Sequence, residues 1–298
     1  MKTPSVTAIV ATKNEEANLA RCLASIHQAE RILVVDSRST DRTVNIALAA
    51  NAEVFTFDYC GGYPKKRQWA LNTIPLTTEW VLMLDADEVV PPALWDEIRE
   101  AIGGPAARDG YLIQKGFHFL GRRLRFGGFS HRAVALLRAD KARFEELFDG
   151  PSEGLDMEVH ERVMVVGTVG RLRTPLIHED FKGLTAYLDK HNRYSTWEAH
   201  VRQMYLDSNR WGKLTIKPRL FGNSQERRRF LKKFAIRIPF ESWLWFVYHY
   251  FVCLGVLEGM PGLIASQIRM QYISNVRSKL YELRTRTAIP LRPQAAKR

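Results

Sequence analysis

The sequence predicts an α/β protein with a mostly parallel sheet flanked by helices, followed by a mainly helical C-terminal region that is basic and aromatic. The first observation behind this prediction is that short apolar segments alternate with amphipathic segments up to residue 92, as in strands joined by crossover helices. The second is the charge distribution. Residues 1–181 contain 22 Lys and Arg against 25 Asp and Glu, a net of −3, whereas residues 182–298 contain 22 against 7, a net of +15. We therefore expect two domains, 1–181 and 182–298.

The apolar segments place four strands in the first part of the chain. Continuous apolar runs that stop at charged or turn-forming residues are typical of strands buried on both faces. Apolar residues at helical spacing, with acidic residues in the first turn, predict helices between them. The predicted strands are 6–11, 31–35, 53–57 and 80–84, and the predicted helices are 15–28, 41–50 and 64–72. Further along we expect strands at 133–138 and 163–169 and an amphipathic helix at 184–206.

Length and composition are those of an ordinary globular protein. The chain has 298 residues, of which 46% are hydrophobic and 26% are charged. Its three cysteines, Cys22, Cys60 and Cys253, are too widely separated to indicate a disulfide framework or a zinc site, which favours a reducing compartment. The N-terminal apolar stretch is short and soon ends in charge, so we expect no secretory signal and a location on the cytoplasmic side.

Acidic residues follow the fourth predicted strand in the segment LDADE. Asp85, Asp87 and Glu88 come directly after the apolar run 80–84. Ligands of open α/β sheets bind at the carboxyl ends of the strands, and carboxylate oxygens spaced in this way suit a divalent cation that carries phosphate. The alternative for this segment alone is a solvated turn or a helix N-terminus.

A dinucleotide-binding domain would share this rhythm of strands and helices. The turn after the first strand, however, reads TKNEE at residues 12–16 and lacks the glycines that let a pyrophosphate approach a helix N-terminus. Two glutamates in that turn would repel the phosphate. The sequence therefore disfavours nicotinamide and flavin cofactors.

Four segments in a fixed order resemble a known family. They are TKNEE at 12–16, VVDSRSTDRT at 34–43, YPKKRQWAL at 63–71 and LDADE at 84–88. Together they resemble the nucleotide-sugar-binding half of the family-2 inverting glycosyltransferases, which have the GT-A fold, and in particular the bacterial lipopolysaccharide-core enzymes of that family. The resemblance covers about residues 5–200 well and the remaining residues more loosely. It implies that domain 1–181 binds the nucleotide sugar and is catalytic.

The resemblance also implies where the donor binds. Asp36, with Thr12 and Glu15, would line the pocket for the base and ribose, and Arg67 would lie close to the uracil of a UDP-sugar. An alternative for the acids after the second strand is helix capping, which we assign to Asp41. For Arg67 the alternative is a solvated charge on a helix.

A divalent metal, Mg²⁺ or Mn²⁺, is the cofactor that the resemblance implies. Asp87 would hold the metal against the diphosphate, and Asp85 would share the metal or reach the ribose. His178, in the segment RTPLIHEDF, would be a further contact to the metal or the diphosphate. The metal would act as a Lewis acid on the departing nucleoside diphosphate.

The general base is expected in the later half of the chain, on the acceptor side. The resemblance favours Glu161, in the segment VHER, as the catalytic base, with His160 orienting it. Glu179 and Asp180 are the second choice. Each histidine could instead be an ordinary, partly buried residue.

Two segments of the chain suggest contacts beyond the donor. Residues 116–132 are rich in glycine, arginine and phenylalanine, which suits either an exposed hairpin or a surface that contacts an acceptor with phosphate or carboxylate groups. Residues 243–257 form an aromatic, apolar block after the basic segment 226–233. This block is short for a membrane-spanning helix and favours peripheral or shallow insertion at an anionic membrane surface, with a buried core helix as the alternative. Nucleic-acid binding is disfavoured because the basic residues flank a dense apolar block.

These inferences lead to one expected function and two alternatives. We expect an inverting glycosyltransferase that moves a sugar from a nucleotide sugar to a lipid-linked or lipopolysaccharide-core saccharide at the cytoplasmic face of the inner membrane. One alternative is a haloacid-dehalogenase-like phosphatase, which shares the Asp-x-Asp-x-Val pattern. That family needs a later paired-acid motif, and the chain contains no Asp-Asp. The other is a catalytically inactive membrane-surface binding protein.

Overall fold

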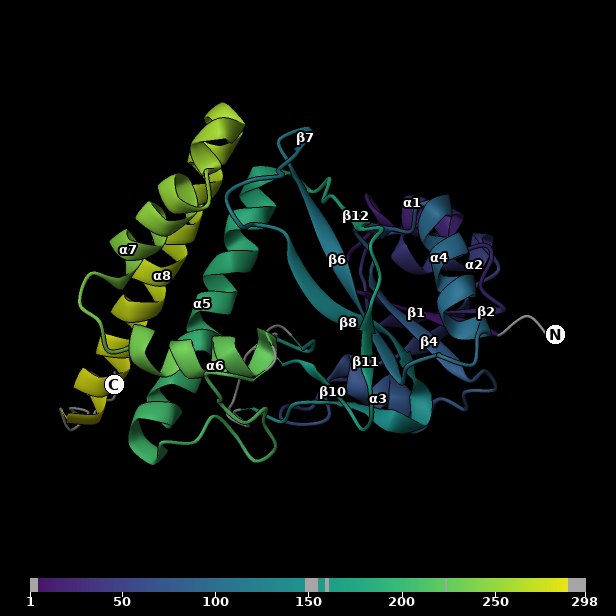
Figure 1. Ribbon diagram of the computed structural model, residues 1–298, viewed down its shortest axis with the longest axis horizontal. Coiled ribbons are helices and arrows are strands. Elements are labelled where there is room, and N and C mark those ends of the chain that lie inside the picture. Colours follow the sequence, from purple (N-terminus) through teal and green to yellow (C-terminus); the bar gives the residue numbers. More distant parts are fainter. Residues whose placement is uncertain (1–4, 148–154, 159–160, 223, 289–298) are drawn as a thin grey trace, which may run out of the picture.

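A sheet flanked by helices forms one part of the molecule, and a layer of long C-terminal helices forms the other (Figure 1). The computed structural model describes residues 5–147, 155–158, 161–222 and 224–288. The main sheet has the strand order β3-β2-β1-β4-β8-β6-β12-β5, and β7 and β11 also pair with β6. The sheet is therefore mixed, with a parallel half and an extension that contains antiparallel pairs.

The parallel half consists of the four strands that the apolar segments predict. All seven residues of β1 are buried, because the strand is covered on both faces. These strands are β1 (Val6–Thr12), β2 (Arg31–Asp36), β3 (Glu53–Thr56) and β4 (Trp80–Asp85). In the register of this half, Thr12 is paired with Asp36, and Ala11 with Asp85. The polar residues at the strand ends therefore lie on one edge.

Helices cover both faces of this half. Helices α1 (Leu19–Ser25), α2 (Thr43–Ala49) and α4 (Pro92–Gly103) pack on one face, and α3 (Lys66–Thr73) packs on the other. The prediction that the first helix begins at residue 15 was wrong. The backbone N–H groups of Glu15 and Glu16 donate instead to Thr43 Oγ1 (2.7 Å) and Asp41 Oδ2 (3.1 Å), which holds this segment as a turn against the start of α2.

The remaining strands extend the sheet beyond β4. They are β5 (Glu88–Val89), β6 (Gly110–Phe119), β7 (Arg122–Arg123), β8 (His131–Arg138), β11 (Val169–Arg171) and β12 (Leu176–His178), with β9 (Ala142–Phe144) and β10 (Val163–Val165) in a separate two-stranded sheet. A 3₁₀ turn, η1 (Ala139–Lys141), precedes β9. The predicted strand at 163–169 is divided into β10 and β11, because the chain turns at Gly167, where φ is +128°. Within the glycine-rich stretch 116–132, β6 and β7 form a hairpin.

The C-terminal layer is helical, as predicted. It contains α5 (Gly183–Ser208), α6 (Ser224–Ala235), α7 (Glu241–Val247), the π-helical turn η2 (Tyr248–Val252), the 3₁₀ turn η3 (Gly255–Glu258) and α8 (Gly259–Ala288). Helices α5, α7 and α8 lie side by side at the left of Figure 1. A buried ion-pair network joins α5 to α7, in which Arg202 contacts Glu198 at 2.9 Å and Glu241 at 2.7 Å.

The apolar block at 243–257 is not one helix. The chain bends between α7 and α8, and Leu254 has a positive φ of 60° at the bend. Within the described part of the chain, no single helix is long and apolar enough to cross a membrane. The segments Glu241–Val252 and Gly255–Thr285 meet at a bend of 70° and satisfy the length and composition criteria only as a pair.

Candidate active site

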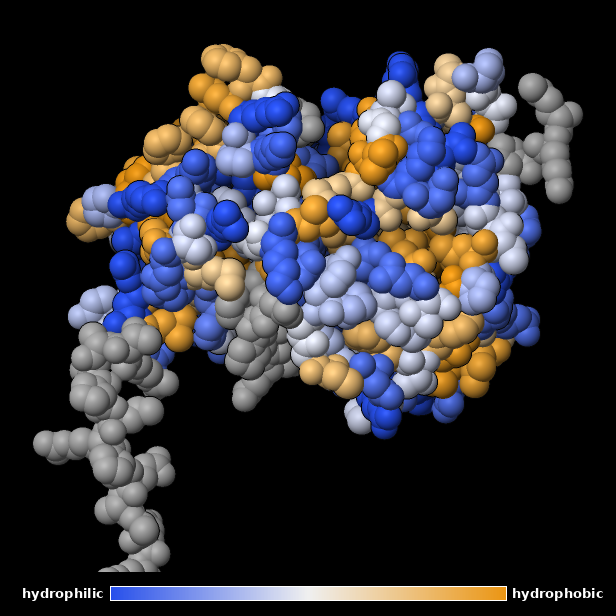
Figure 2. All heavy atoms as spheres, turned by 90° about the horizontal axis from the view of Figure 1, so that it is seen from below, coloured by the Kyte–Doolittle hydropathy of each residue, from blue (hydrophilic) through white to orange (hydrophobic). Residues whose placement is uncertain are grey.

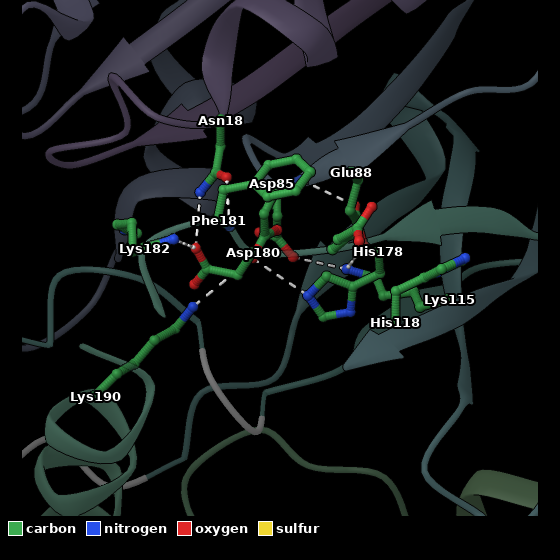
Figure 3. A network of polar contacts seen from close by, with 12 residues as sticks. Asn18, Asp85, Glu88, Lys115, His118, His178, Asp180, Phe181, Lys182 and Lys190 are labelled. Atoms are coloured by element: carbon green, nitrogen blue, oxygen red, sulfur yellow. Dashed lines mark hydrogen bonds and ion pairs between the residues drawn. The ribbon is translucent and has the colours of Figure 1, made fainter. Parts of the chain in front are cut away.

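Charged side chains gather where the carboxyl ends of β1 and β4 meet β12 and α5. Figure 3 shows Asp85, Glu88, Lys115 and His178 turned toward one another, with Lys190 reaching in from α5. Strand β12 brings His178 into this group because it pairs with β5, in the register His178 to Glu88. The site therefore combines the end of the parallel half with elements from much later in the chain.

Asp85 is neutralised by two cations. Its carboxylate forms an ion pair with Arg67 and a second ion pair with Lys115, whose Nζ atom lies 2.8 Å from Oδ2. Burial alone would raise the pKa of Asp85, but Arg67 and Lys115 hold it well below its ordinary value. The anionic form of Asp85 is thus favoured and its charge is balanced by Arg67 and Lys115, which leaves Asp87 as the better metal ligand of the two.

Asp87 is buried and only partly satisfied. Its Oδ2 atom lies 3.3 Å from His178 Nε2 and 3.9 Å from Lys190 Nζ. Its other oxygen, Oδ1, is buried and has no hydrogen-bond partner among the described residues. Burial raises the pKa of Asp87, but His178 and Lys190 outweigh burial and leave it below the ordinary value. A buried carboxylate oxygen without a partner is costly unless a ligand binds there.

The residues at this position fit a divalent metal that is shared with a ligand. The described residues contain no group of three or more His, Cys, Asp or Glu side chains that could hold a metal by themselves. Asp87 supplies a carboxylate, which suits both Mn²⁺ and Mg²⁺, and His178 supplies an imidazole, which suits Mn²⁺ better than Mg²⁺ because Mg²⁺ prefers oxygen ligands. A metal held by these two residues would take its remaining ligands from water or from the phosphates of a bound nucleotide.

The residues predicted to hold the base and ribose lie at the ends of β1 and β2. Thr12 Oγ1 donates to Asp36 Oδ1 at 2.8 Å, and the backbone N–H of Ser39 donates to Asp36 Oδ2 at 2.7 Å. Glu15 forms an ion pair with Lys182 at 2.5 Å. The structure brings Thr12 and Asp36 together, and it places Glu15 beside the loop that precedes α5.

Of the residues considered for the base, some lie in the site and some do not. Glu161 forms an ion pair with Lys65 at 2.7 Å, and its side chain is only 3% exposed. Glu179 pairs with Arg21 at 2.9 Å. Asp180 Oδ1 accepts from Asn18 Nδ2 at 2.9 Å and lies in the group of Figure 3. His160 falls outside the described residues. The assignment of Glu161 as the base stays a prediction.

Sequence reasoning missed two lysines of the site. Lys115 contacts both Asp85 and Glu88, the latter at 2.7 Å, and Lys190 approaches Asp87. Lys190 lies on the amphipathic helix predicted at 184–206, in which we predicted no site residue. An isolated lysine on an amphipathic helix has no local signal that separates a solvated charge from a buried one.

Comparison with known proteins identifies the class. Residues 7–119 match the profile described as Glycosyl transferase family 2. The chain is therefore a glycosyltransferase with a family-2 domain, and its sheet and flanking helices form the GT-A fold. The family resemblance, the fold class and the enzyme class expected from the sequence are confirmed.

One relative extends the match beyond that domain, and another matches about a third of the chain. The chain is 27% identical over 300 residues to the lipopolysaccharide core biosynthesis glycosyltransferase LpsC of Rhizobium meliloti, covering 97% of this chain and 95% of LpsC. An uncharacterized glycosyltransferase of Rickettsia bellii is 39% identical over 111 residues, which span 37% of this chain and 36% of that protein.

Two solved structures are similar at lower levels. TarS 1–349 of S. aureus has a TM-score of 0.42 and 17% identity, covering 94% of this chain and 91% of that one. Glucosyl-3-phosphoglycerate synthase of Mycobacterium tuberculosis, in complex with Mn²⁺, UDP and glucosyl-3-phosphoglycerate, has a TM-score of 0.28 and 22% identity, covering 34% of this chain and 39% of that one.

Proposed function

We propose that this glycosyltransferase transfers a sugar from a UDP-sugar to a lipid-linked or lipopolysaccharide-core saccharide, with inversion and with the help of Mg²⁺ or Mn²⁺. The family supplies the reaction class, and the similarity to LpsC over nearly the whole chain supports the acceptor class. The observation that carries the donor half is Asp87, because its buried Oδ1 atom lacks a partner among the described residues while His178 and Lys190 lie beside it.

Each charged group of the site has a role in this reaction. A metal bound to Asp87 and His178 would stabilise the charge of the departing nucleoside diphosphate. Lys190 supplies a second positive charge to the diphosphate. Arg67 and Lys115 fix the carboxylate of Asp85, and this fixed geometry holds the β4–β5 turn, and with it Asp87, in position.

The base removes the proton from the acceptor hydroxyl. Glu161 is our predicted base, with Glu179 and Asp180 as alternatives. Because Glu179 is paired with Arg21, Asp180 is the better placed of the two alternatives. Replacing the true base with its amide should stop transfer while UDP binding is retained. We therefore expect one of the two variants, Glu161→Gln or Asp180→Asn, to lose transfer. A variant that keeps full activity shows that the replaced residue is not the base.

Thermal unfolding with UDP and Mn²⁺ tests the donor half. A ligand at a hundred times its Kd stabilises the folded state by about 2.7 kcal/mol. We expect a large shift with UDP and Mn²⁺ together and its loss in Asp87→Asn, which keeps the shape of the side chain. Asp96→Asn on α4 is the matched control, because Asp96 is an exposed aspartate with 70% of its side chain accessible. An undiminished metal-dependent shift in Asp87→Asn would refute the donor site. GDP and dTDP test the choice of nucleotide.

We also propose that the enzyme binds an anionic membrane surface through the bend between α7 and α8. Large apolar side chains along α7 and at the bend are exposed, and we call them the apolar bend surface: Phe240, Trp243, Leu244, Phe251, Val252, Leu257 and Met260. Figure 2 shows hydrophobic surface at the left, the end of the molecule that Figure 1 assigns to α7 and α8. Exposed apolar patches of this kind are typical of interaction sites.

Positive charge beside this surface favours lipid as the partner. The loop after β7 is fastened to the bend, since the backbone N–H of Gly127 donates to Cys253 O at 2.7 Å and that of Phe126 donates to Glu258 Oε1 at 2.7 Å. Arg125, in this loop, and Arg122, in β7, are exposed, although Arg122 also pairs with Glu258 at 3.2 Å. Arginines next to exposed aromatic residues are typical of segments at the interface of an anionic membrane. This surface would hold the enzyme at the inner membrane, where a lipid-linked acceptor is found.

A further inference from the structure

Helix α6 has charged side chains on its inward side, where a surface helix usually has apolar ones. Arg229 and Lys232 are three residues apart and therefore lie on the same side of the helix. Arg229 is only 7% exposed, and its Nη2 atom lies 2.6 Å from both carboxylate oxygens of the buried Glu145. Lys232 Nζ lies 2.7 Å from Glu198 on α5. Ion pairs therefore hold the inward side of α6 to the rest of the molecule.

The outward side of α6 is apolar at its centre. Leu231 and Phe234 are also three residues apart, and they are 54% and 57% exposed. Arg227 precedes Leu231 by one turn of the helix and shares this side, and both Arg227 and Arg228 are exposed. A helix that exposes large apolar side chains and buries charged ones is expected where its outward side meets an apolar medium.

The charge around the outward side favours an anionic lipid as that medium. Arg227 and Arg228 are exposed at the start of α6, and Arg237 is exposed just after its end. The only acid in the sequence of α6 is Glu226, which is partly buried and lies 4.0 Å from Arg219. Guanidinium groups bind phosphates through paired hydrogen bonds. Basic residues that surround exposed apolar ones are typical of helices at the interface of an anionic membrane.

The outward side of α6 leads into the apolar bend surface along the chain. Ile238 is 40% exposed, and Phe240, the first residue of the apolar bend surface, is 74% exposed. Figure 1 shows α6 at the lower end of the C-terminal layer and the bend between α7 and α8 at its upper end. Membrane contacts at both ends would fix the tilt of the enzyme, whereas a contact at the bend alone would let it pivot.

We propose that α6 is a second membrane-binding element of this enzyme. Leu231 and Phe234 insert among the acyl chains of an anionic membrane, while Arg227 and Arg228 bind the phosphates of the lipid headgroups. The inference rests on the proposed function for its purpose, which is to set the orientation of the donor site toward a lipid-linked acceptor. Membrane binding itself can be tested without a sugar or an acceptor.

Sedimentation of the full chain with phosphatidylglycerol vesicles tests the apolar contacts. We expect the double variant Leu231→Ser/Phe234→Ser to bind at least about tenfold more weakly, with an unchanged melting temperature because both side chains are exposed. The matched control is Leu48→Ser/Val166→Ser, which removes two apolar side chains that are 57% and 74% exposed elsewhere in the molecule. Undiminished binding of the α6 variant, or an equal loss in the control, overturns the proposal.

The choice of lipid tests the arginines. The unmodified enzyme should prefer phosphatidylglycerol to phosphatidylcholine vesicles, and Arg227→Gln/Arg228→Gln should weaken binding to phosphatidylglycerol at least about tenfold. Arg108→Gln/Arg173→Gln is the matched control, because these arginines are exposed on the part of the molecule that contains the sheet. Equal binding of the unmodified enzyme to both lipids, or unchanged binding of the α6 variant, contradicts the proposal.

Two comparisons separate this proposal from its alternatives. If Trp243→Ser/Leu257→Ser binds vesicles normally and Leu231→Ser/Phe234→Ser does not, the proposal for the apolar bend surface fails and that for α6 stands. If only the bend variant loses binding, the proposal for α6 fails. A second copy of the chain is the other possible partner of α6. If the enzyme is dimeric without vesicles in analytical ultracentrifugation and Leu231→Ser/Phe234→Ser is monomeric, the outward side of α6 joins two copies and the proposal is wrong.

Discussion

His178 Nε2 lies 3.3 Å from Asp87 Oδ2, although 91 positions separate the two residues in the chain. The backbone reinforces this contact, because the N–H of Glu179 donates to the carbonyl oxygen of Asp87 at 3.0 Å. The end of β12 is thus fixed to the turn after β4 by both main chain and side chain. This junction is the part of the site that would hold the proposed metal.

Replacing His178 with alanine should weaken Mn²⁺ binding in the presence of UDP by at least about tenfold, since one of two protein ligands is lost. Titration calorimetry with Mn²⁺ at saturating UDP measures the change. His118→Ala is the control, because His118 lies near the site on β6 but bonds to the carbonyl oxygen of Gly116. Equal Mn²⁺ affinity in His178→Ala and the unmodified enzyme would exclude His178 as a ligand.

Lys190→Gln should weaken UDP binding about tenfold and leave the binding of uridine unchanged. The reason is electrostatic: Lys190 stays protonated, because Tyr194 and Asp87 outweigh the effect of burial and keep its pKa above the ordinary value, and its charge attracts the diphosphate. Calorimetry with the two ligands separates phosphate contacts from base contacts. Arg193→Gln removes an exposed charge from the same helix and should change neither affinity. A parallel loss of uridine affinity in Lys190→Gln would assign Lys190 a structural role instead.

Arg202→Met should lower the free energy of unfolding by about 3 kcal/mol, because it leaves the buried carboxylates of Glu198 and Glu241 without their shared partner. Urea unfolding followed by circular dichroism provides the measurement. Arg210→Ala, an exposed arginine just beyond α5, is expected to change stability by less than about 0.5 kcal/mol. Lys232 also lies 2.7 Å from Glu198, and Arg277 lies 3.4 Å from Glu241. A loss below about 1 kcal/mol in Arg202→Met would show that these two cations compensate.

Exchanging Trp243 and Leu257 for serine should reduce sedimentation with phosphatidylglycerol vesicles at least about tenfold, since each apolar side chain that enters a membrane contributes about 1.5–3 kcal/mol. Both side chains are 60% exposed, so folding should be preserved. Leu48→Ser, at a residue of α2 that is 57% exposed, is the control for loss of an exposed apolar side chain elsewhere. Undiminished sedimentation of the double variant would refute the role of the apolar bend surface.

The packing of α5 against α8 should weaken as the pH falls from about 6.5 toward 4. His191 lies 4.0 Å from Tyr187 and 5.9 Å from Tyr272, measured between ring centroids, and burial lowers its pKa to about 4. The folded state resists protonation while the unfolded chain accepts it near pH 6.5. The stabilisation is therefore complete above pH 6.5 and is lost as the pH falls through this window.

His191→Phe keeps a ring at this position and cannot titrate, so the melting temperature of the variant should depend less on pH between 4.5 and 6.5. Lys190 and Arg269 also face His191 and oppose its protonation. The control is His27→Asn, at an exposed histidine. Identical pH profiles for His191→Phe and the unmodified enzyme would contradict the prediction.

The parallel half of the sheet could be predicted from the sequence because its strands are apolar on both faces and end at polar residues such as Asp36 and Asp85. This pattern is local and needs no knowledge of the rest of the chain. The extension could not be predicted in the same way. Strand β5 has only two residues, and β12 has three, one of which is a histidine. Such short segments form strands because neighbouring strands hydrogen-bond to them. Their own sequences therefore carry little indication of strand structure.

The candidate site was likewise predicted only in part from the sequence. The resemblance implied that Asp87 and Asp85 hold the metal, and His178 was a further candidate for a metal or diphosphate contact. The structure places His178 beside Asp87. Lys115 and Lys190 were missed, since whether a lysine is buried beside a carboxylate depends on tertiary contacts. Glu161 was predicted to be the general base from its segment VHER. The structure shows that its carboxylate forms an ion pair with Lys65. No pattern in the sequence indicates that pairing, because the two residues are brought together only by the fold.

Strand β12 is the last strand of the sheet to be synthesised, yet it lies between β6 and β5, which both precede it in the chain. The sheet of a growing chain is therefore incomplete until residue 178 has left the ribosome. At about 5–20 residues per second, the wait after β6 lasts several seconds. During that time β6 has an open edge that can pair with another chain. For the same reason, a fragment limited to residues 7–119, the part matched by the family profile, would lack β8 and β12 and is a poor choice for expression.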